Sequence, residues 1–492
     1  MERIDLKDLE KYLWDSANFL RGHIDAGDYK QYIFPLLFLK RISDVWDEEY
    51  AWTVKEYGED YNDEHRFIIP EGCHWNDIRE ASTNVGEKIR SAMRNIESNN
   101  SNNLFGIFGD AQWTNKERLP DKMLKDLVEH FSTITLSTRN VPDDELGVAY
   151  EYLIKKFADD SGHTAQEFYS NRTVVQLMTQ LLNAEPGESI YDPTCGTGGM
   201  LLIAATHLKN LGKEYRNLKL YGQEINLITS SIARMNMFMH GIADFDIVRG
   251  NTLEQPAFVE QDKLRKFDIV LANPPYSIKR WNRERWMNDP FGRAIWGTPP
   301  QGCADYAFIQ HIVASMNEQG RAAILLPHGV LFRDSELEMR RKMIKDDIVE
   351  CVLGLGANLF YNSPMEACIL FLNKNKVIDR RNKILFINAV NEVRQEKTMS
   401  YLDAQHIKKI DNAFNSNKDE LHFSKWISIN EIEQKGWTLS LPFYVRPEND
   451  IDISPVNDLV RLTESFKKEL EISREQFKDL MEDLKEYNIH GN

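Results

Sequence analysis

After Gly162 the chain alternates short apolar runs with segments long enough for a helix, and this alternation restricts the fold more than any other feature. The runs mostly end at Gly, Pro, Asn or Asp, and in chain order they read SIYDP, LKLYGQE, DIVRG, FDIVLANPP, RAAILLP, VECVLGL and EACILFL. Strands that alternate with helices form βαβ units, in which helices cover a parallel sheet. Ligands of such sheets bind beyond the carboxyl ends of the strands, so we expect the functional residues to gather there.

The residues before this alternation follow a helical pattern. Apolar residues recur at steps of three and four over 4–50, and helical patterns resume through 124–131 and 146–157, as is typical of helices that bury one face. The polar stretch 97–103, ESNNSNN, is predicted to be a loop. We therefore predict a helical N-terminal domain over residues 1–160.

The remaining sequence is divided into an α/β domain over 161–400 and a C-terminal region over 401–492, in keeping with a length that allows about three domains. From Phe466 to Tyr487 apolar residues recur at alternating steps of four and three, and no Gly or Pro interrupts 456–487. This pattern predicts a long helix at the end of the chain. Such a helix either packs on its own domain or docks against another subunit.

Composition excludes several classes of protein. No apolar run approaches the roughly 20 residues of a membrane helix, and the first residues lack the layout of a signal peptide. The chain has 5 cysteines, and their spacing fits neither a zinc site nor a redox pair. We therefore expect a cytoplasmic protein with free thiols, no metal site and no contact with a membrane.

A glycine-rich turn follows the first predicted strand within the segment Ser189–Met200, and a helical pattern comes after it. Glycines at 196, 198 and 199 permit positive φ and a close approach of the backbone to a ligand. The N-terminus of the following helix can bind a carboxylate or another polar group. The turn predicts a binding site, although a purely structural turn would also use glycine.

Polar residues at the ends of neighbouring predicted strands favour a nucleoside as the ligand. Asp192 ends the first strand, and Glu224 ends the second, where a carboxylate can accept both hydroxyls of a ribose. Asn251 follows the third strand and could face an adenine ring. The chain has no GxxxxGK[ST] loop, and its turn does not fit GxGxxG. These residues suit S-adenosylmethionine better than a nucleoside triphosphate or a dinucleotide.

The strand FDIVLA leads into Asn273-Pro274-Pro275-Tyr276. Two consecutive prolines fix φ, so the Asn273 side chain and the Pro274 carbonyl are held as stiff acceptors. Two hydrogen bonds accepted from an exocyclic NH2 group turn its nitrogen toward sp3 geometry and align it with a methyl donor. Tyr276 would stack on the base, which must be flipped out of a duplex. The motif predicts methyl transfer to the amino group of a base.

With DPxxGTGG followed by NPPY, the chain resembles the modification (methyltransferase) subunit of type I restriction-modification systems over nearly its whole length. The resemblance implies a Rossmann-like, S-adenosylmethionine-dependent methyltransferase domain that methylates adenine N6 in DNA. It implies that Asn273 to Tyr276 form the catalytic loop. It also implies a cofactor site that contains Asp192, Thr194, Gly196, Thr197, Gly198, Gly199 and Glu224.

Two segments depart from the pattern of that family. A QYFTPR-like segment caps the cofactor in the family, and its place is taken here by Glu167-Phe168-Tyr169-Ser170-Asn171-Arg172. Ser and Asn replace the usual Thr-Pro, so the backbone is less rigid, while Arg172 and the aromatic pair remain. Asn251 stands where the family usually has Asp, and its amide can still pair with adenine. We predict cofactor contacts from both segments.

The loop after the catalytic motif interleaves basic and aromatic residues, which suits contact with phosphates and stacking on an opened strand. These residues are Lys279, Arg280, Trp281, Arg283, Arg285 and Trp286. One basic loop on a chain of net charge -16 is too little for sequence-specific DNA binding. We therefore expect a separate specificity (DNA-recognition) subunit and, from the resemblance, a second copy of this chain in the complex, which a restriction (nuclease/translocase) subunit could join.

Three alternatives share part of this pattern. Cytosine N4 is a nearby target on DNA, although its enzymes more often carry Ser or Asp before the two prolines. NPPY also serves enzymes that methylate RNA amino groups or protein glutamine, which are usually smaller. A cofactor-binding assembly module without catalysis is disfavoured, because the glycine turn and NPPY are both intact.

Overall fold

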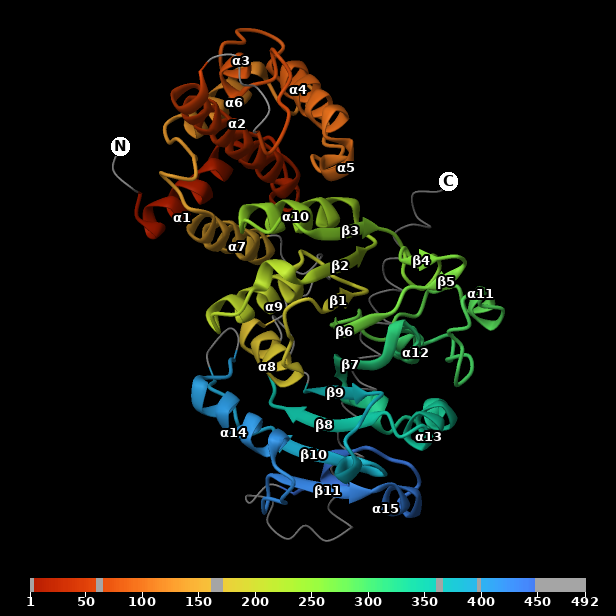
Figure 1. Cartoon of the computed structure of the whole chain (residues 1–492). Helices are drawn as coiled ribbons and strands as arrows, with labels where there is room; N and C mark the ends of the chain where they lie inside the picture. Colours follow the sequence, from red (N-terminus) through yellow and green to blue (C-terminus); the bar gives the residue numbers. More distant parts are fainter. Residues whose placement is uncertain (1–3, 59–64, 161–170, 360–365, 396–399, 447–492) are drawn as a thin grey trace.

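The computed structural model describes residues 4–58, 65–160, 171–359, 366–395 and 400–446. The helix predicted over 456–487 lies outside the described residues. Figure 1 shows a helical unit, built by the first part of the chain, on top of a second unit that is organised around a twisted sheet. Among the described helices, none is long and apolar enough to cross a membrane.

The helical unit forms where the apolar steps of three and four predict helices. Its residues bury one core, which also takes in the face of α10 (Leu227–Met239) that carries Met235 and Phe238. The unit therefore packs directly on a helix of the sheet unit. Its helices are α1 (Leu6–Asp15), α2 (Lys30–Tyr57), α3 (Trp75–Arg79), α4 (Val85–Asn99), α5 (Ser101–Leu104), α6 (Asp121–Ser132) and α7 (Asp143–Asp160), with 3-10 turns at Ser16–Phe19 and Ala26–Asp28.

The prediction of a loop over 97–103 is wrong, because α4 runs to Asn99 and α5 begins at Ser101. The polar side chains stabilise the helix end instead of breaking it. Asn99 Nδ2 donates to Asn95 O (2.8 Å), and Asn100 Nδ2 donates to Ile96 O (2.8 Å). Such bonds add a side-chain donor to carbonyls of the last turn and so hold the end of the helix.

The second unit contains a nine-stranded sheet in the order β11-β10-β8-β9-β7-β6-β1-β2-β3. All seven predicted runs form strands of this sheet, and most of these strands are buried along nearly their whole length, because helices cover both faces. The strands are β1 (Ser189–Asp192), β2 (Lys219–Glu224), β3 (Phe245–Arg249), β6 (Phe267–Ala272), β7 (Met316–Pro327), β8 (Val349–Leu355), β9 (Ala367–Asn373), β10 (Lys383–Ala389) and β11 (Ser424–Ser428), and a separate hairpin is made by β4 (Val259–Glu260) and β5 (Lys263–Leu264).

The expectation of a purely parallel sheet is wrong at two places. β9 lies antiparallel between β7 and β8, and β11 pairs antiparallel with β10 at the edge. The strands β7, β6, β1, β2 and β3 are all parallel to their neighbours in this half. The carboxyl ends of this parallel half therefore meet at one edge, as the predicted site requires.

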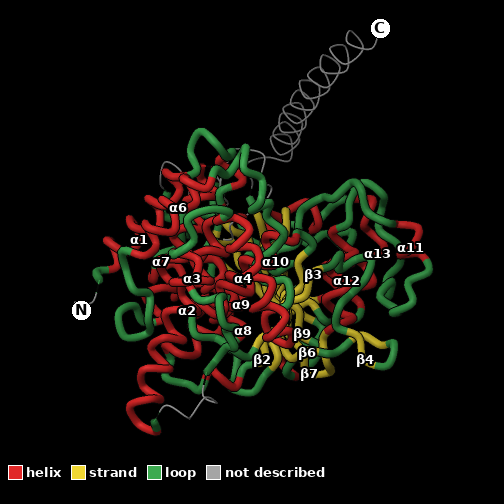
Figure 2. Tube along the Cα trace, turned by 90° about the horizontal axis from the view of Figure 1, so that it is seen from above, coloured by secondary structure: helices red, strands yellow, loops and turns green. Residues whose placement is uncertain are grey.

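Helices cover the two faces of the sheet. In Figure 2, α8 and α9 lie on the opposite side of the strands from α12 and α13. The sheet continues past residue 400 through β11, so the boundary expected there falls within one sheet, and the three domain ranges remain predictions. The helices are α8 (Arg172–Leu182), α9 (Gly199–Asn210), α10, α11 (Arg283–Met287), α12 (Asp305–Ser315), α13 (Leu337–Lys345), α14 (Ala404–Asn415) and α15 (Ile429–Gln434).

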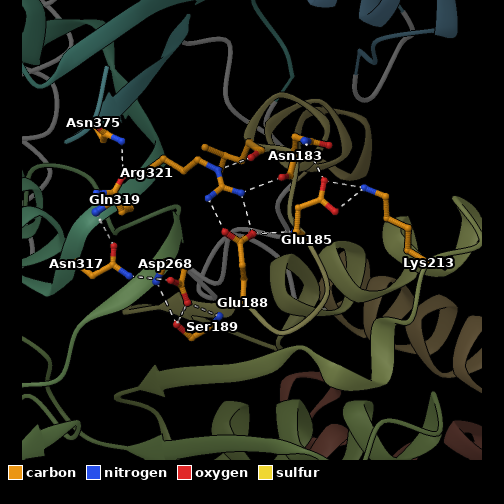
Figure 3. Close-up of polar contacts among 11 residues, drawn as sticks. Asn183, Glu185, Glu188, Ser189, Lys213, Asp268, Asn317, Gln319, Arg321 and Asn375 are labelled. Atoms are coloured by element: carbon orange, nitrogen blue, oxygen red, sulfur yellow. Dashed lines mark hydrogen bonds and ion pairs between the residues drawn. The ribbon is translucent and has the colours of Figure 1, made fainter. Parts of the chain in front are cut away.

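A polar network ties together the amino ends of β1, β6 and β7 (Figure 3). Asp268 accepts hydrogen bonds from Ser189 N (2.8 Å), from Ser189 Oγ (2.6 Å) and from Asn317 Nδ2 (2.7 Å). Arg321 donates two bonds of 2.8 Å to the carboxylate of Glu188. Paired charged groups of this kind fix geometry well. The network holds three strands in register, so their opposite ends present the site residues at fixed positions.

Candidate active site

The candidate site is a pocket where neighbouring strands end. β1 ends at Asp192, β2 ends at Glu224, and β6 ends one residue before Asn273. All three residues line one cavity of about 620 Å³, and Asn251, just beyond β3, lines it as well. A concave cavity of this size accommodates a small-molecule cofactor.

Two carboxylates at the strand ends hold the glycine-rich turn. Asp192 Oδ1 accepts a hydrogen bond from Thr194 N (3.0 Å). Glu224 Oε2 accepts one from Gly196 N (3.0 Å), and its other oxygen accepts one from Asn226 N (2.8 Å). The carboxylates therefore fix the backbone of the turn and at the same time face the cavity.

The turn needs glycine at two of its positions. Gly196 has φ +54° and Gly198 has φ +81°, which is the left-handed region that other residues adopt at a cost. A Cβ atom on Gly198 would also lie 2.7 Å from Cε of Met237 on α10. Gly198 itself does not line the cavity; it allows α9 to begin close to α10.

The strand-end side of the pocket carries two carboxylates, Asp192 and Glu224, and an unsatisfied polar atom. Burial raises the pKa of Asp192 to about 7; the Thr194 N–H opposes this rise, and the neighbouring Glu224 adds to it. Thr194 Oγ1 is buried and has no hydrogen-bond partner among the described residues. This side of the pocket suits a ligand that brings polar groups and positive charge.

The loop that carries Asn251 is held by a buried guanidinium. Asn251 Oδ1 accepts a hydrogen bond from Leu253 N (3.1 Å), which closes a turn of the backbone. Arg293 is 1% exposed; it donates to the carbonyls of Thr252 and Leu253 (both 2.8 Å) and forms an ion pair with Asp289 (2.7 Å). Sequence reasoning missed Arg293, since it lies in a loop without any motif.

The catalytic motif follows β6. Asn273 and Pro275 line the cavity, whereas Pro274 is buried and Tyr276 is half-buried beside it. The Tyr276 hydroxyl donates a hydrogen bond to Asn273 Oδ1 (2.9 Å), and burial raises the pKa of this phenol. The ring and the carboxamide that were predicted to act together are therefore in direct contact.

A buried cluster of charged residues lies behind this motif and holds its backbone. Ser277 has φ +51°, and its N–H donates to Asp305 Oδ1 (2.8 Å) at the start of α12. Asp305 also pairs with Arg333, which bonds Glu336 (2.9 Å) as well. Cys303 Sγ lies 3.0 Å from Asp305 Oδ2. Since Arg333 pairs with both carboxylates, the cluster positions the catalytic loop. The sequence contained no signal for it.

The segment predicted to cap the cofactor is only partly described. Asn171 caps α8, and its Nδ2 donates to Leu359 O (3.0 Å) and Ser400 O (2.8 Å), away from the cavity. Arg172 lines the cavity and forms an ion pair with Glu151 of α7. The four preceding predicted residues, Glu167, Phe168, Tyr169 and Ser170, lie outside the described residues.

Most of the predicted residues meet at the cavity. Gly198, Asn171, Pro274 and Tyr276 do not line it, although each directly adjoins a residue in the chain that does. Whether each residue contacts a ligand remains a prediction. Those that line the cavity are Arg172, Asp192, Thr194, Gly196, Thr197, Gly199, Glu224, Asn251, Asn273 and Pro275.

The basic loop after the motif differs from the prediction at one residue. Trp286 is 2% exposed, and the Arg293 guanidinium lies 4.7 Å from its ring centre. The prediction that Trp286 stacks on an opened DNA strand is therefore wrong. Trp281 is half-buried and lines the cavity together with Arg280, while Lys279 and Arg285 are exposed. The basic face predicted for DNA lies next to the catalytic motif.

The helical unit contributes a wall that sequence reasoning missed. In the sequence these residues match the periodic pattern of a helix core, so nothing distinguished them. They are Lys30 and Phe34 of α2, and Glu151, Ile154, Phe157 and Ala158 of α7.

The fold and the pocket together define an amino-methyltransferase of the Rossmann-like class: a glycine turn after β1, a carboxylate at the end of β2 and NPPY at the end of β6 surround one cavity. Comparison with known proteins identifies the family. Residues 141–452 match the model of the N-6 DNA methylase family, and residues 9–131 match that of the HsdM N-terminal domain. The chain belongs to the N-6 DNA methylase family.

The similarity to individual relatives extends over most of the length of both chains. The chain is 28% identical to the type I restriction enzyme MpnII methylase subunit of Mycoplasma pneumoniae, over 97% of this chain and 96% of that protein. It is 30% identical to the MjaVIII methylase subunit of Methanocaldococcus jannaschii, over 96% and 84%. The structure of the type I restriction-modification system methyltransferase subunit from Streptococcus thermophilus matches with a TM-score of 0.78 and 30% identity, over 90% of this chain and 100% of that one.

These matches confirm three of the sequence predictions. The chain is an adenine-specific DNA methyltransferase, it acts on N6, and it is of the methylase-subunit type found in type I restriction-modification systems. The predicted Rossmann-like unit with a helical N-terminal region is confirmed as well. The alternatives of cytosine N4, RNA and protein glutamine are not supported.

Proposed function

We propose that the cavity at the strand ends binds S-adenosylmethionine, with the ribose at Glu224 and the adenine ring near Asn251. The observation that carries this proposal is that the ends of β1, β2 and β6 face one cavity of about 620 Å³. The buried Thr194 Oγ1 lacks a partner among the described residues, and the carboxylates of Asp192 and Glu224 suit a ligand with a sulfonium and an ammonium group.

The target adenine would be held by the residues after β6. The Asn273 side chain and the Pro274 carbonyl would accept the two amino protons, and the Tyr276 ring would stack on the base. Asn273 Oδ1 now accepts the Tyr276 hydroxyl (2.9 Å), so an arriving amine exchanges with this bond. The bound cofactor supplies a methyl group on sulfur, and its transfer breaks a C–S bond, forms a C–N bond and releases an amine proton.

Specificity would come from other subunits. We propose that this chain forms a complex with DNA, a specificity subunit and a second copy of itself. The complex acts in the cytoplasm, and a restriction subunit can join it. The net charge of -16 supports this division of labour, because strong binding to phosphates needs basic surface. The exposed Lys279 and Arg285 beside the catalytic motif would supply the local contacts.

The test is a methylation assay with radiolabelled S-adenosylmethionine and DNA, with and without the specificity subunit. Label should appear in N6-methyladenine. Asn273→Ala should lower incorporation about a hundredfold or more, which is the usual loss when a group aimed at the reacting atoms is removed. Asn288→Ala, an exposed residue after α11, is the matched control and should retain full activity.

Three results would contradict the proposal. Label in N4-methylcytosine would place a different base in the pocket. Full activity of Asn273→Ala would show that the end of β6 does not hold the amine. Tight, sequence-specific DNA binding by the isolated chain would contradict the need for a specificity subunit.

A further inference from the structure

The helical unit forms one wall of the pocket, although its family model describes a separate domain. Lys30 and Phe34 lie on the first two turns of α2, four residues apart and therefore on one face. Phe34 packs against Phe157 of α7 with ring centres 5.6 Å apart at 87°. Phe34 is 1% exposed and Phe157 is 3% exposed. This packing fixes the start of α2 at the cavity.

The charged residues of the pocket lining come from several elements. The three acidic residues are Asp192, Glu224 and Glu151. Among the basic residues, Arg172 is paired with Glu151, and Arg280 lies on the loop that follows the catalytic motif. Lys30 is the basic residue that the helical wall contributes.

The cofactor site proposed above leaves one part of S-adenosylmethionine unassigned. Glu224 and Asn251 take the nucleoside, and Asn273 lies where the methyl group must be presented, but none of these offers a positive charge. The amino-acid end of the cofactor carries a carboxylate, which needs a cation or N–H donors when it leaves water. Among the described residues, the wall formed by the helical unit offers such a cation in Lys30.

We propose that Lys30 binds the carboxylate of the methionyl group of S-adenosylmethionine, so that the helical unit is part of the cofactor site. This inference rests on the proposed cofactor site and extends it to a residue 162 positions before Asp192 in the chain. Its consequence is that cofactor affinity depends on contact between the two units. The ammonium of Lys30 recognises the amino-acid end and makes no contribution to the nucleoside end.

The test compares two ligands by isothermal titration calorimetry with the full chain. S-adenosylmethionine has the carboxylate, and 5′-methylthioadenosine lacks the whole amino-acid end. Lys30→Met should weaken S-adenosylmethionine about tenfold to a hundredfold, the range for a charge-assisted hydrogen bond. It should leave 5′-methylthioadenosine unchanged. Lys30→Arg keeps the charge and should lose far less affinity.

The matched control is Lys55→Met, at the exposed far end of the same helix, which should change neither affinity. If Lys30→Met weakens both ligands equally, or weakens neither, the assignment is overturned; Lys30→Gln repeats the comparison if the Met variant does not fold. If the unaltered chain binds neither ligand, the proposed cofactor site itself fails, which is a distinguishable result.

Discussion

The glycine-rich turn after β1 and the catalytic motif after β6, called the tip below (residues 273–277), face the same pocket. They are held in place by different sets of contacts. In the turn, Thr194 N bonds Asp192 two residues away, and Gly198 N bonds the carbonyl of Cys195 (2.8 Å). At the tip, Ser277 is held by Asp305, which is 28 residues further along the chain. Glu224 also holds Gly196 N of the turn from 28 residues away. The turn thus combines local contacts with a remote one, whereas Ser277 at the tip is held by a remote carboxylate.

This difference explains which features could be predicted. A local structure leaves its signature in adjacent residues, such as the glycines required by positive φ. A remote support leaves no periodic or motif signature, because any of several loops could deliver a carboxylate or a guanidinium. Removal of one remote support should therefore disturb the tip more than a comparable change disturbs the turn.

The largest effect is expected from Arg293→Met, which tests a remote support of the loop that carries Asn251. The change leaves the buried Asp289 carboxylate, with a side chain 2% exposed, without its ion pair, and it removes donors from two carbonyls. Loss of one member of a buried pair costs about 3 to 5 kcal/mol. Urea unfolding should show this loss, while Arg285→Met, an exposed neighbour, should stay within about 0.5 kcal/mol. Equal values for both variants would refute the special role of Arg293.

Gly198→Ala tests the local structure and should have the next largest effect. The left-handed φ of +81° costs an alanine about 1 to 2 kcal/mol, and the contact with Met237 adds to this. We expect a loss of unfolding free energy of about 2 to 3 kcal/mol, measured in urea. Gly302→Ala is the control, since no described atom lies within 4 Å of its Cβ position and its φ is not positive. A stable Gly198→Ala would mean that the turn tolerates side chains.

Asp192→Asn tests how the charge of Asp192 affects the stability of the chain. The pKa of Asp192 is about 7 in the folded chain and near 3.8 when unfolded, so the folded chain holds this proton to higher pH. Unfolding therefore releases a proton between about pH 4 and 7, and stability falls as the pH rises through this window. Relative to Asp192→Asn, the unaltered chain should lose stability progressively across this window.

Urea unfolding of both chains at pH 4.5, 6 and 8 measures this difference. Asp334→Asn, at an exposed position, is the control variant. A constant gap between the Asp192→Asn variant and the unaltered chain would show that Asp192 is ionised over the whole range.

The smallest effect is expected from Asp305→Asn, and it concerns rate. The amide can still accept the Ser277 N–H, but it loses its charge opposite Arg333, so the loop is held less firmly. We expect methylation to slow about tenfold, equivalent to about 1.4 kcal/mol in the barrier. The Kd for S-adenosylmethionine should not change, because Asp305 does not line the cavity. A parallel rise in Kd would instead indicate general damage to the pocket.

The sequence by itself determined the elements that local chemistry defines. Apolar runs marked strands because both faces of the sheet are covered, and the glycines and prolines marked the two turns because few other residues fit those backbones. The same reasoning failed at 97–103, where Asn side chains bond carbonyls within the helix, and it missed β10 and β11 in a more charged region.

Only the tertiary structure decided the direction of β9, the burial of Trp286, the supports at Arg293 and Asp305, and the wall that brings Lys30 to the pocket. The physical reason is the separation along the chain between the residues that interact. Backbone conformation and burial period depend on neighbours in the chain, whereas ion pairs and pocket walls depend on which distant segments pack together.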